Sequence, residues 1–435
     1  MKKQCRKGLV ISWFYPPGNS SEGLVTYKLL KNSKYQYDVF TRGCQNDGVW
    51  DRNTDEKKLV SDNVTILQSK SHESNEWIEE VIKYFDENAD KYDFIMSRIM
   101  PAEAHEAAAR IKAKHPEVFW TASFGDPLVD SPYIEYDKKD DNPYYLEKYI
   151  ARENPSKAKA FKLLVSPTRN MRKYVWEKDR RDRNSFACKY KKINHDTFVG
   201  ADLLIFNNKI QMDRAFSKDY SNYREKGVVI NHSYDLDLYP KAKGNKDGKI
   251  HFLYVGHLDE RRNALSLLEA IKSLKDNYKD LSEKAVFDFY GHMDKEDKSK
   301  IIDYCLTDCV KIHDNIDYLS SLEKISNSDW LILIDTNLNK ELDEYIYFPA
   351  KLADYMGSKK NILAITQLKG ATADIVKKVE CGKVVTHSAE DIYLNLAMIL
   401  EGKMPNFKYN DSEWSKFDAK NVADKFDALI EQKLA

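Results

Sequence analysis

Residues 250–270 read IHFLYVGHLDERRNALSLLEA, and this stretch decides the fold that we predict for the chain. The apolar run Ile250–Val255 has the length and composition of a buried strand, and a glycine follows it. A short loop then carries Arg261 and Arg262, and Leu265–Leu274 repeats apolar residues at helical spacing. Strand, loop and helix in this order are typical of a parallel α/β sheet, where ligands bind beyond the strand ends. We therefore predict that both arginines lie at a ligand site beside a helix N-terminus.

The same alternation of short apolar runs and helical patterns extends along most of the chain, and it predicts two doubly wound halves of similar size. A polar, glycine-containing stretch, residues 241–248, separates the halves and is predicted to be a linker. The predicted strands of the first half are Leu9–Phe14, Tyr37–Thr41, Val64–Leu67, Phe94–Ser97, Phe119–Ser123, Leu203–Phe206 and Val228–Ile230. Those of the second half are Ile250–Val255, Val286–Tyr290, Val310–His313, Leu331–Ile334, Leu363–Thr366 and Val384–Thr386.

Helical patterns connect these strands, and the chain ends in one of them. The clearest patterns are Glu22–Leu30, Glu76–Phe85, Ala102–Lys114, Leu265–Leu274 and a helix near Lys298–Cys305. Residues 412–435 repeat apolar side chains at helical spacing and should pack one face on a neighbouring domain. We predict an N-terminal domain over 1–240, a C-terminal domain over 241–405, and a terminal helix over 406–435 that returns to the first domain.

The overall composition excludes several classes of protein. The 435 residues include 69 Lys and Arg and 69 Asp and Glu, and a chain with no net charge is a poor general binder of nucleic acid. No run approaches the ~20 apolar residues of a spanning helix, and the N-terminus lacks a signal-peptide pattern, so we expect a cytoplasmic protein. The cysteines are scattered and are expected to be reduced and metal-free: Cys5, Cys44, Cys188, Cys305, Cys309 and Cys381.

One segment departs from the even distribution of charge. Residues 154–194 carry thirteen Lys and Arg against three acids, a local charge of 13 − 3 = +10, with apolar residues interleaved. Such a segment suits docking on an anionic membrane surface. It also suits a solvated helical face whose charge is balanced elsewhere in the fold. The sequence leaves both interpretations open.

A second motif covers residues 347–365, YFPAKLADYMGSKKNILAI. Pro349 is expected to open a helix, with Lys351 in its first turn and Asp354 three positions later. The helix dipole disfavours a lysine in the first turn, so Lys351 there requires an anionic partner. That partner is either a bound anion or, in the simpler alternative, Asp354 itself.

At these two motifs the chain resembles the retaining glycosyltransferases of family 4. That family has a strand ending in glycine, then a basic loop residue and a helix, as in Gly256, Arg262 and Leu265–Leu274. It also has a Pro-Lys-Leu-x-Glu/Asp-Tyr helix before a strand, which Phe348–Tyr355 matches. The resemblance implies the GT-B fold, in which two Rossmann-like domains face a cleft. The C-terminal domain would bind a nucleotide sugar, and the N-terminal domain the acceptor.

The resemblance also implies roles for residues on the donor side. Arg262 would bind the donor diphosphate with Lys351 as a second cation, and Asp354 would hold the ribose. The first glutamate of the family's Glu-x7-Glu motif would fall at Ile346 and is absent, and His257 stands where a basic residue often follows the strand glycine. The donor contacts that we assign are Gly256, Arg261, Arg262, His313, Lys351, Asp354 and Thr372.

The acceptor side is expected to come from strand ends of the first half. The loop within Phe14–Leu24 and the segments Thr121–Leu128 and Asn231–Asp235 would face the cleft, and His105 is a further candidate. The acceptor contacts that we assign are Gly18, Asn19, Glu22, His105, Asp126 and His232. Arg262, Lys351 and Asp126 are the expected catalytic residues.

The sequence thus predicts transfer of a hexose from a UDP- or GDP-linked donor to a glycan or lipid-linked acceptor, with retention and without a metal ion. Asp235 and Asp237 form the Asp-x-Asp pattern of metal-dependent enzymes, but their position suits a helix start better. Bacterial surface polysaccharide synthesis at the inner face of the membrane is the expected setting. Two alternatives remain: a nucleotide-sugar epimerase with the same fold, and a catalytically weak partner subunit.

Overall fold

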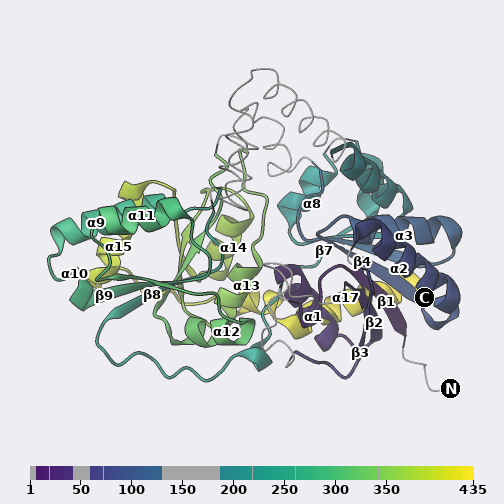
Figure 1. Ribbon diagram of the computed structural model, residues 1–435, viewed down its shortest axis with the longest axis horizontal. Helices are drawn as coiled ribbons and strands as arrows, with labels where there is room; N and C mark the ends of the chain where they lie inside the picture. Colours follow the sequence, from purple (N-terminus) through teal and green to yellow (C-terminus); the bar gives the residue numbers. More distant parts are fainter. Residues whose placement is uncertain are drawn as a thin grey trace, which may run out of the picture.

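Two parallel sheets organise the part of the chain that the computed structural model describes, residues 6–18, 20–42, 59–71, 73–129, 187–217, 219–259, 261–339 and 342–435. One sheet has seven strands and the other has six. Figure 1 shows the two α/β units side by side, with helices around each sheet and the last helix, α17, lying alongside α1 of the first unit.

The first sheet has the order β3-β2-β1-β4-β5-β6-β7, so the chain reverses its direction of travel between β1 and β4. Its strands are β1 (Lys7–Ser12), β2 (Gln36–Thr41), β3 (Val64–Gln68), β4 (Phe94–Ile99), β5 (Phe119–Phe124), β6 (Leu203–Phe206) and β7 (Gly227–Val229). The helices include α1 (Ser21–Asn32), α2 (Ser74–Asn88), α3 (Glu103–Lys114) and α8 (Lys209–Ala215), and residues 187–200 are also helical.

The second sheet repeats this plan with the order β10-β9-β8-β11-β12-β13. Its strands are β8 (Ile250–Val255), β9 (Ala285–Tyr290), β10 (Val310–His313), β11 (Trp330–Ile334), β12 (Asn361–Ile365) and β13 (Gly382–Val385). Its helices are α9 (Leu265–Asn277), α10 (Leu281–Lys284), α11 (Lys295–Asp303), α12 (Tyr318–Asn327), α13 (Ala350–Gly357), α14 (Ala371–Val379) and α15 (Ala389–Leu400). In such sheets the ligand site lies beyond the strand ends at the point of reversal.

The strands predicted from the sequence are confirmed. Leu203–Phe206, Ile250–Val255 and Val310–His313 match to the residue, and the other strands differ by at most two residues at either end. Agreement is close because strands buried on both faces are continuous apolar runs, which stand out from the polar loops. The central strand β1 is typical, with Leu9, Val10 and Ile11 all fully buried.

The C-terminal tail joins the two units. It comprises α16 (Asp411–Trp414), a 3₁₀ turn and α17 (Ala419–Leu434). The Trp414 ring stacks on Tyr234 with centroids 4.8 Å apart, and its indole nitrogen donates to the carbonyl of Met356 at 2.8 Å. Helix α17 then packs on α1, where Asp427 accepts from Ser33 Oγ at 2.6 Å. The tail therefore ties the second unit to the helix that follows β1.

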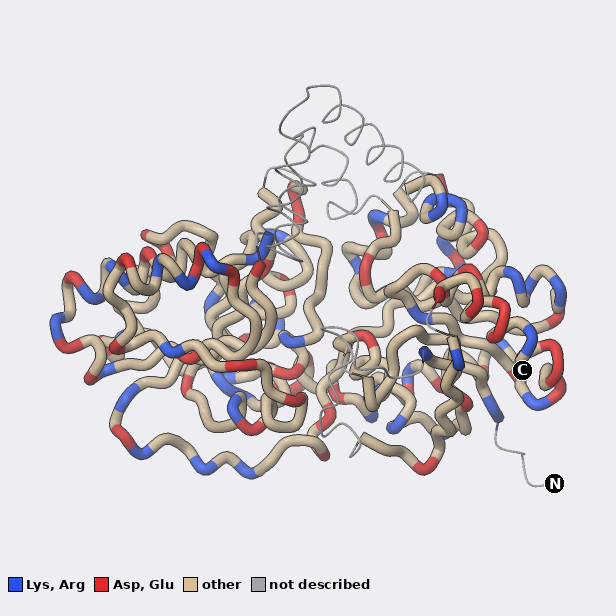
Figure 2. Tube along the Cα trace, viewed as in Figure 1, with Lys and Arg blue, Asp and Glu red and all other residues tan. Residues whose placement is uncertain are grey.

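Charge is spread evenly over the described surface, and Figure 2 shows basic and acidic positions intermixed on both units. Cys5, Cys44 and all of the basic segment before residue 187 lie outside the described residues. Within the described ranges, Cys188, Cys305, Cys309 and Cys381 are free thiols. No helix among the described residues combines the length and the apolar character needed to span a bilayer.

Candidate functional site

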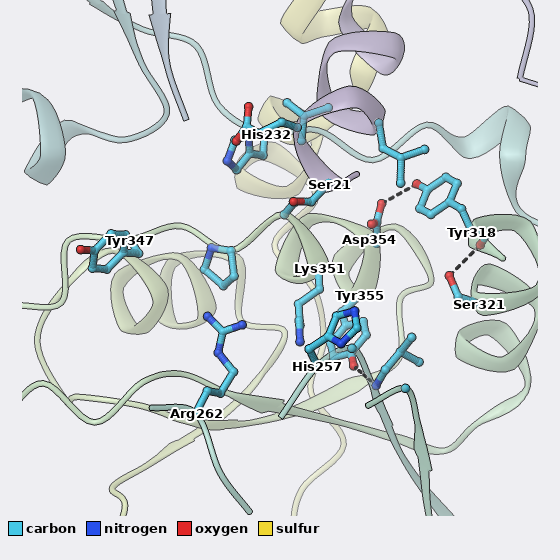
Figure 3. Close-up of a pocket in the computed structure, with 18 of the residues that line it drawn as sticks. Ser21, His232, His257, Arg262, Tyr318, Ser321, Tyr347, Lys351, Asp354 and Tyr355 are labelled. Carbon is cyan, nitrogen blue, oxygen red and sulfur yellow. Dashed lines mark hydrogen bonds between the residues drawn. The ribbon is translucent and has the colours of Figure 1, made fainter. Parts of the chain in front are cut away.

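A cavity of about 500 Å³ lies where the two units meet. Its volume is within the range of roughly 300–1,000 Å³ that is typical of small-molecule sites. The second unit contributes the β8–α9 loop, the start of α13 and one face of α12. The first unit contributes the start of α1 and the segments after β5 and β7. Figure 3 shows Ser21 and His232 of the first unit on the far side of this cavity from Arg262.

Two cations of the second unit converge in the cavity. The carboxylate of Asp259 accepts from the backbone nitrogens of Arg261 and Arg262 at 2.9 and 3.0 Å, which folds the β8–α9 loop. Figure 3 shows the Arg262 guanidinium and the Lys351 ammonium directed toward the same space. Lys351 Nζ donates to the hydroxyl of Tyr254 at 3.0 Å and lies 4.3 Å from the centre of that ring. The two motifs that the sequence singles out therefore meet at one place.

The glycine that ends β8 is needed for this arrangement. Gly256 has φ +135°, a conformation that L side chains rarely adopt, and a Cβ there would lie 2.5 Å from Lys351 Nζ. The missing side chain lets the ammonium group pack against the end of the strand. Gly256 thus acts by admitting Lys351, and it lines the cavity as well.

The electrostatics of this wall favour an anionic ligand. Burial and the nearby Arg262 guanidinium lower the pKa of Lys351 well below its usual value, with Asp335 opposing them. Asp335 is 1% exposed and bonded to Thr366 Oγ1 at 2.8 Å, and burial raises its pKa. Two like charges in a partly desolvated site are stabilised by an anion that bonds to both.

The N-terminus of α13 adds backbone donors to the same wall. Its N-cap is Pro349, which provides no side-chain hydrogen bond to the first turn. Pro349, Ala350 and Lys351 all line the cavity. The first N–H groups of a helix need partners from outside the helix, and together with the helix dipole they favour an anion.

Asp354 does not pair with Lys351, so the simpler alternative for this motif is wrong. Lys28 Nζ, from α1 of the first unit, reaches Asp354 Oδ1 at 2.8 Å, and the Lys28 side chain is only 1% exposed. The hydroxyl of Tyr318 donates to the same oxygen at 2.8 Å (Figure 3). Asp354 faces α1 and α12 while Lys351 faces Tyr254, so the two side chains diverge from their common helix.

Two carboxylates face the cavity from the first unit. Arg98 donates to Glu22 at 3.0 Å and to Ser123 Oγ at 3.0 Å, and thereby holds Glu22 at the start of α1. Burial raises the pKa of Glu22, and Arg98 opposes the rise. Asp126 is exposed to the cavity, but protein atoms crowd around it; this desolvation, together with Glu22, raises its pKa to about 7, against the effect of Arg262. Asp126 therefore changes its charge near neutral pH.

His232 forms an uncharged part of the cavity wall. Burial, followed by Arg98 and Lys28, lowers its pKa to about 3. Its Nε2 lies 3.1 Å from Asn207 Nδ2, and its ring packs 5.2 Å from that of Phe348. A neutral imidazole in this position can exchange a hydrogen bond with a ligand but adds no charge to the site.

Some predicted site residues do not line the cavity. His105 is fully buried beneath α3, where its Nδ1 bonds to Ser97 Oγ at 2.8 Å, because α3 turns this face toward β4. His313 bonds to Asp288 at 2.6 Å and stacks behind Tyr290, whose ring does line the cavity. Thr372 is buried in α14, and Gly18 lies outside the lining. Asn19 lies outside the described residues.

The Asp-x-Asp pattern is placed where the sequence suggests a helix start. Asp235 accepts from the backbone nitrogen of Asp237 at the beginning of a 3₁₀ turn. It also forms an ion pair with Lys31 at 2.7 Å. The first aspartate thus caps the turn and binds a lysine of α1.

Sequence reasoning missed several residues of the site. Lys28 and Arg98 each stand within an apolar run, Leu24–Leu30 and Phe94–Ile99, and both are buried. A cation in a buried run requires a partner, so this pattern could have indicated a buried ion pair. The aromatic residues Tyr254, Tyr318 and Tyr347 carry no such signal, because the chain contains 27 tyrosines and nothing in the local pattern sets these three apart.

We predict that the Lys28–Asp354 pair is a strong link between the units. Lys28→Met leaves a buried carboxylate without its cation and should lower the free energy of unfolding by about 3 kcal/mol. The double variant with Asp354→Asn should lose less than the sum of the two single changes, because the neutral amide needs no cation. Urea unfolding of the full chain measures each change.

The exposed pair Lys272–Asp276 on α9 provides the matched control, since Lys272→Met should have no measurable effect. If Lys28→Met were as harmless as Lys272→Met, the ion pair would not hold the units together.

Comparison with known proteins identifies the fold. No family model and no curated protein matches this sequence. A sucrose-phosphate synthase from Thermosynechococcus elongatus is similar in structure, with a TM-score of 0.67 and 13% identity over 98% of this chain and 99% of that one. The lipopolysaccharide outer core galactosyltransferase WaaB has a TM-score of 0.55 and 12% identity over 98% of this chain and 99% of its own.

Epimerases are among the similar structures as well. A UDP-GlcNAc 2-epimerase from Neisseria meningitidis bound to UDP-GlcNAc has a TM-score of 0.56 and 12% identity, over 98% of this chain and all of that one. At such identities the similarity establishes the fold, and it agrees with the fold that the sequence predicts. The chain has the GT-B fold, with two Rossmann-like parallel-sheet units facing a cleft.

Proposed function

We propose that the protein is a glycosyltransferase that transfers a sugar from a UDP- or GDP-linked donor bound in the interdomain cavity. The observation that carries the proposal is the convergence of Arg262, Lys351 and the open N-terminus of α13 on one wall of the cavity. Transfer of the sugar leaves a nucleoside diphosphate behind, so negative charge develops on the diphosphate in the transition state. Cations and backbone donors that are already in place stabilise this charge.

The remaining donor contacts follow from the same wall. Both groups that bond to Asp354 use Oδ1, and within the described residues Oδ2 makes no hydrogen bond. We propose that Oδ2 accepts from a ribose hydroxyl while Lys28 remains in place. The ring of Tyr290, which His313 supports from behind at 4.1 Å, offers a flat face for the base. Nucleotide-sugar binding is supported by the UDP-GlcNAc in the similar Neisseria epimerase.

On the acceptor side we propose that Asp126 and Glu22 bind the attacking hydroxyl. A group with a pKa of about 7 is suited to proton transfer at neutral pH. Retention at the sugar carbon is implied by the family resemblance and is part of the proposal, as is a reaction without a metal ion. Closure of the cleft would exclude water and limit hydrolysis of the donor.

We also propose a glycan or lipid-linked acceptor in bacterial surface polysaccharide synthesis, with the protein attached to the inner face of the membrane through the basic segment 154–194. The support for this attachment is the composition of the segment, whose local charge is +10. Most of the segment lies outside the described residues, so the support comes from the sequence. Vesicles with acidic lipids should carry the full chain upward in a flotation gradient. Equal recovery with neutral vesicles would contradict membrane attachment by charge.

Donor binding tests the central proposal. Arg262→Ala should weaken the binding of UDP or GDP at least tenfold, because a charge-assisted hydrogen bond to phosphate contributes roughly 1.5–3 kcal/mol. Lys351→Met should act in the same direction. Calorimetry with each nucleotide measures both effects, and Arg224→Ala on the distant surface is the matched control.

Binding and activity measurements together separate the alternative functions. Unchanged nucleotide affinity in Arg262→Ala would contradict the proposed donor site. Turnover of the donor with no acceptor present would indicate an epimerase. Tight donor binding without transfer to any acceptor would indicate a non-catalytic partner subunit.

The pH dependence of donor binding tests the role of Asp126. Above pH 7 its carboxyl is ionised and adds a negative charge beside Glu22, so the affinity for UDP-glucose should fall as pH rises through 7. The diphosphate of UDP-glucose is a diester that does not titrate in this range, which makes it the preferred probe. Asp126→Asn should remove the part of the fall that is centred near pH 7. A wild-type dependence retained in that variant would assign the titration to another group.

A further inference from the structure

A second cavity, of about 200 Å³, lies within the first unit. It is enclosed by the segment after β5, by α8 with the turn that follows it, and by the helix over residues 187–200. None of the residues that the sequence assigns to substrate binding lines it. Its volume is below the roughly 300–1,000 Å³ of ordinary ligand sites and therefore suits a single ring.

Two buried amide side chains, Gln211 and Asn194, line this cavity. Gln211 is 3% exposed, and its Oε1 accepts from the backbone nitrogen of Asn207 at 3.2 Å. Its Nε2 is buried and has no hydrogen-bond partner. Asn194 is also 3% exposed, and it lines the cavity beside Gln211. Burying a polar group without a hydrogen-bond partner costs free energy, and a ligand that bonds to the group would recover that free energy.

The apolar part of the wall is aromatic. Phe124 stacks on Phe206 with ring centroids 5.2 Å apart, and Phe198 lies 4.2 Å from Tyr220. All four of these rings line the cavity. Aromatic walls with a few converging polar groups are typical of ligand sites, and here the polar groups are amides, which bond well to hydroxyls.

Two cations stand at the rim. Lys191 and Arg214 are exposed and make no ion pair within the described residues, whereas the adjacent Lys192 pairs with Asp196 at 2.5 Å. The lining contains one acid, Asp219, so the charge of this set is +1. The rim therefore favours a ligand that carries a negative group.

The second cavity adjoins the cleft through the chain after β5. Asp126 lines the main cavity, while the next two residues, Pro127 and Leu128, line the second one. The backbone carbonyl of Gly125 is held from below by Asn207 Nδ2. A ring bound in the second cavity would therefore lie beside the stretch of chain that carries Asp126.

We propose that this cavity binds the acceptor, and that the acceptor is an anionic sugar. Its ring would pack on the aromatic wall and bond to Gln211 Nε2 and Asn194, and its phosphate or carboxylate would bind Lys191 and Arg214. This inference rests on the proposed transferase function, because it names the acceptor for the same reaction.

The test uses the full chain and calorimetry with five probes: glucose 6-phosphate, glucuronic acid, glucose, inorganic phosphate and UDP. An anionic hexose should bind at least tenfold more tightly than glucose or inorganic phosphate alone, because only it uses both the ring contacts and the cations. The two anionic hexoses distinguish a phosphate from a carboxylate as the preferred group.

Variants locate the binding. The double variant Lys191→Gln, Arg214→Gln should lower the affinity for the anionic hexose at least tenfold and leave the affinity for UDP unchanged. Both side chains are exposed, so the fold should tolerate the changes, and Arg110→Gln on the outer face of α3 is the control. Gln211→Glu keeps the side-chain oxygen that accepts a hydrogen bond from the backbone nitrogen of Asn207, but it replaces the Nε2 amide group that would donate to the sugar. This variant should also weaken binding of the anionic hexose.

The outcomes separate this inference from the proposed function. If UDP binds while no anionic hexose does, or while the rim variants leave hexose binding unchanged, the acceptor pocket is wrong and the donor site stands. If the hexose binds as predicted but UDP does not, the cavity is a sugar site and the proposed transferase function is wrong.

Discussion

The buried ion pair between Lys28 and Asp354 is the constraint on which the geometry of the cleft depends. It joins α1 of the first unit to α13 of the second at 2.8 Å, in a place where water reaches little of either side chain. Removing both charges from water is costly, and the cost is offset only when the partners keep close contact. The pair therefore favours a closed arrangement in which the strand ends of the two sheets face each other. The Tyr318 hydroxyl, bonded to the same carboxylate oxygen, adds to this preference.

With the units held in this way, the cavity has two walls of opposite character. One wall carries Arg262, Lys351 and the N-terminus of α13, and the other carries Glu22 and Asp126. In the proposed function, the diphosphate of the donor would lie against the second unit, where the cations are. The acceptor hydroxyl would then meet the carboxylates. This asymmetry makes the arrangement suitable for transfer between two substrates.

The fold alone does not decide between transfer and epimerisation, since both activities occur among proteins of similar structure. The decision depends on whether a second substrate has a place to bind. The aromatic cavity beside Asp126, with its buried amides and its cationic rim, offers such a place close to the donor site. It therefore favours a reaction that needs an acceptor.

The sequence by itself determined the strands of the described residues, the two units and the motifs around Arg262 and Lys351, because apolar runs and strand-end loops are local patterns. It did not determine which faces of the helices meet. His105 turned out to be a core residue, and the partner of Asp354 is Lys28, which is 326 positions away in the chain. The amides of Gln211 and Asn194 were likewise unmarked in the sequence. Only the tertiary structure decides such contacts, because they arise where segments far apart in the chain pack together.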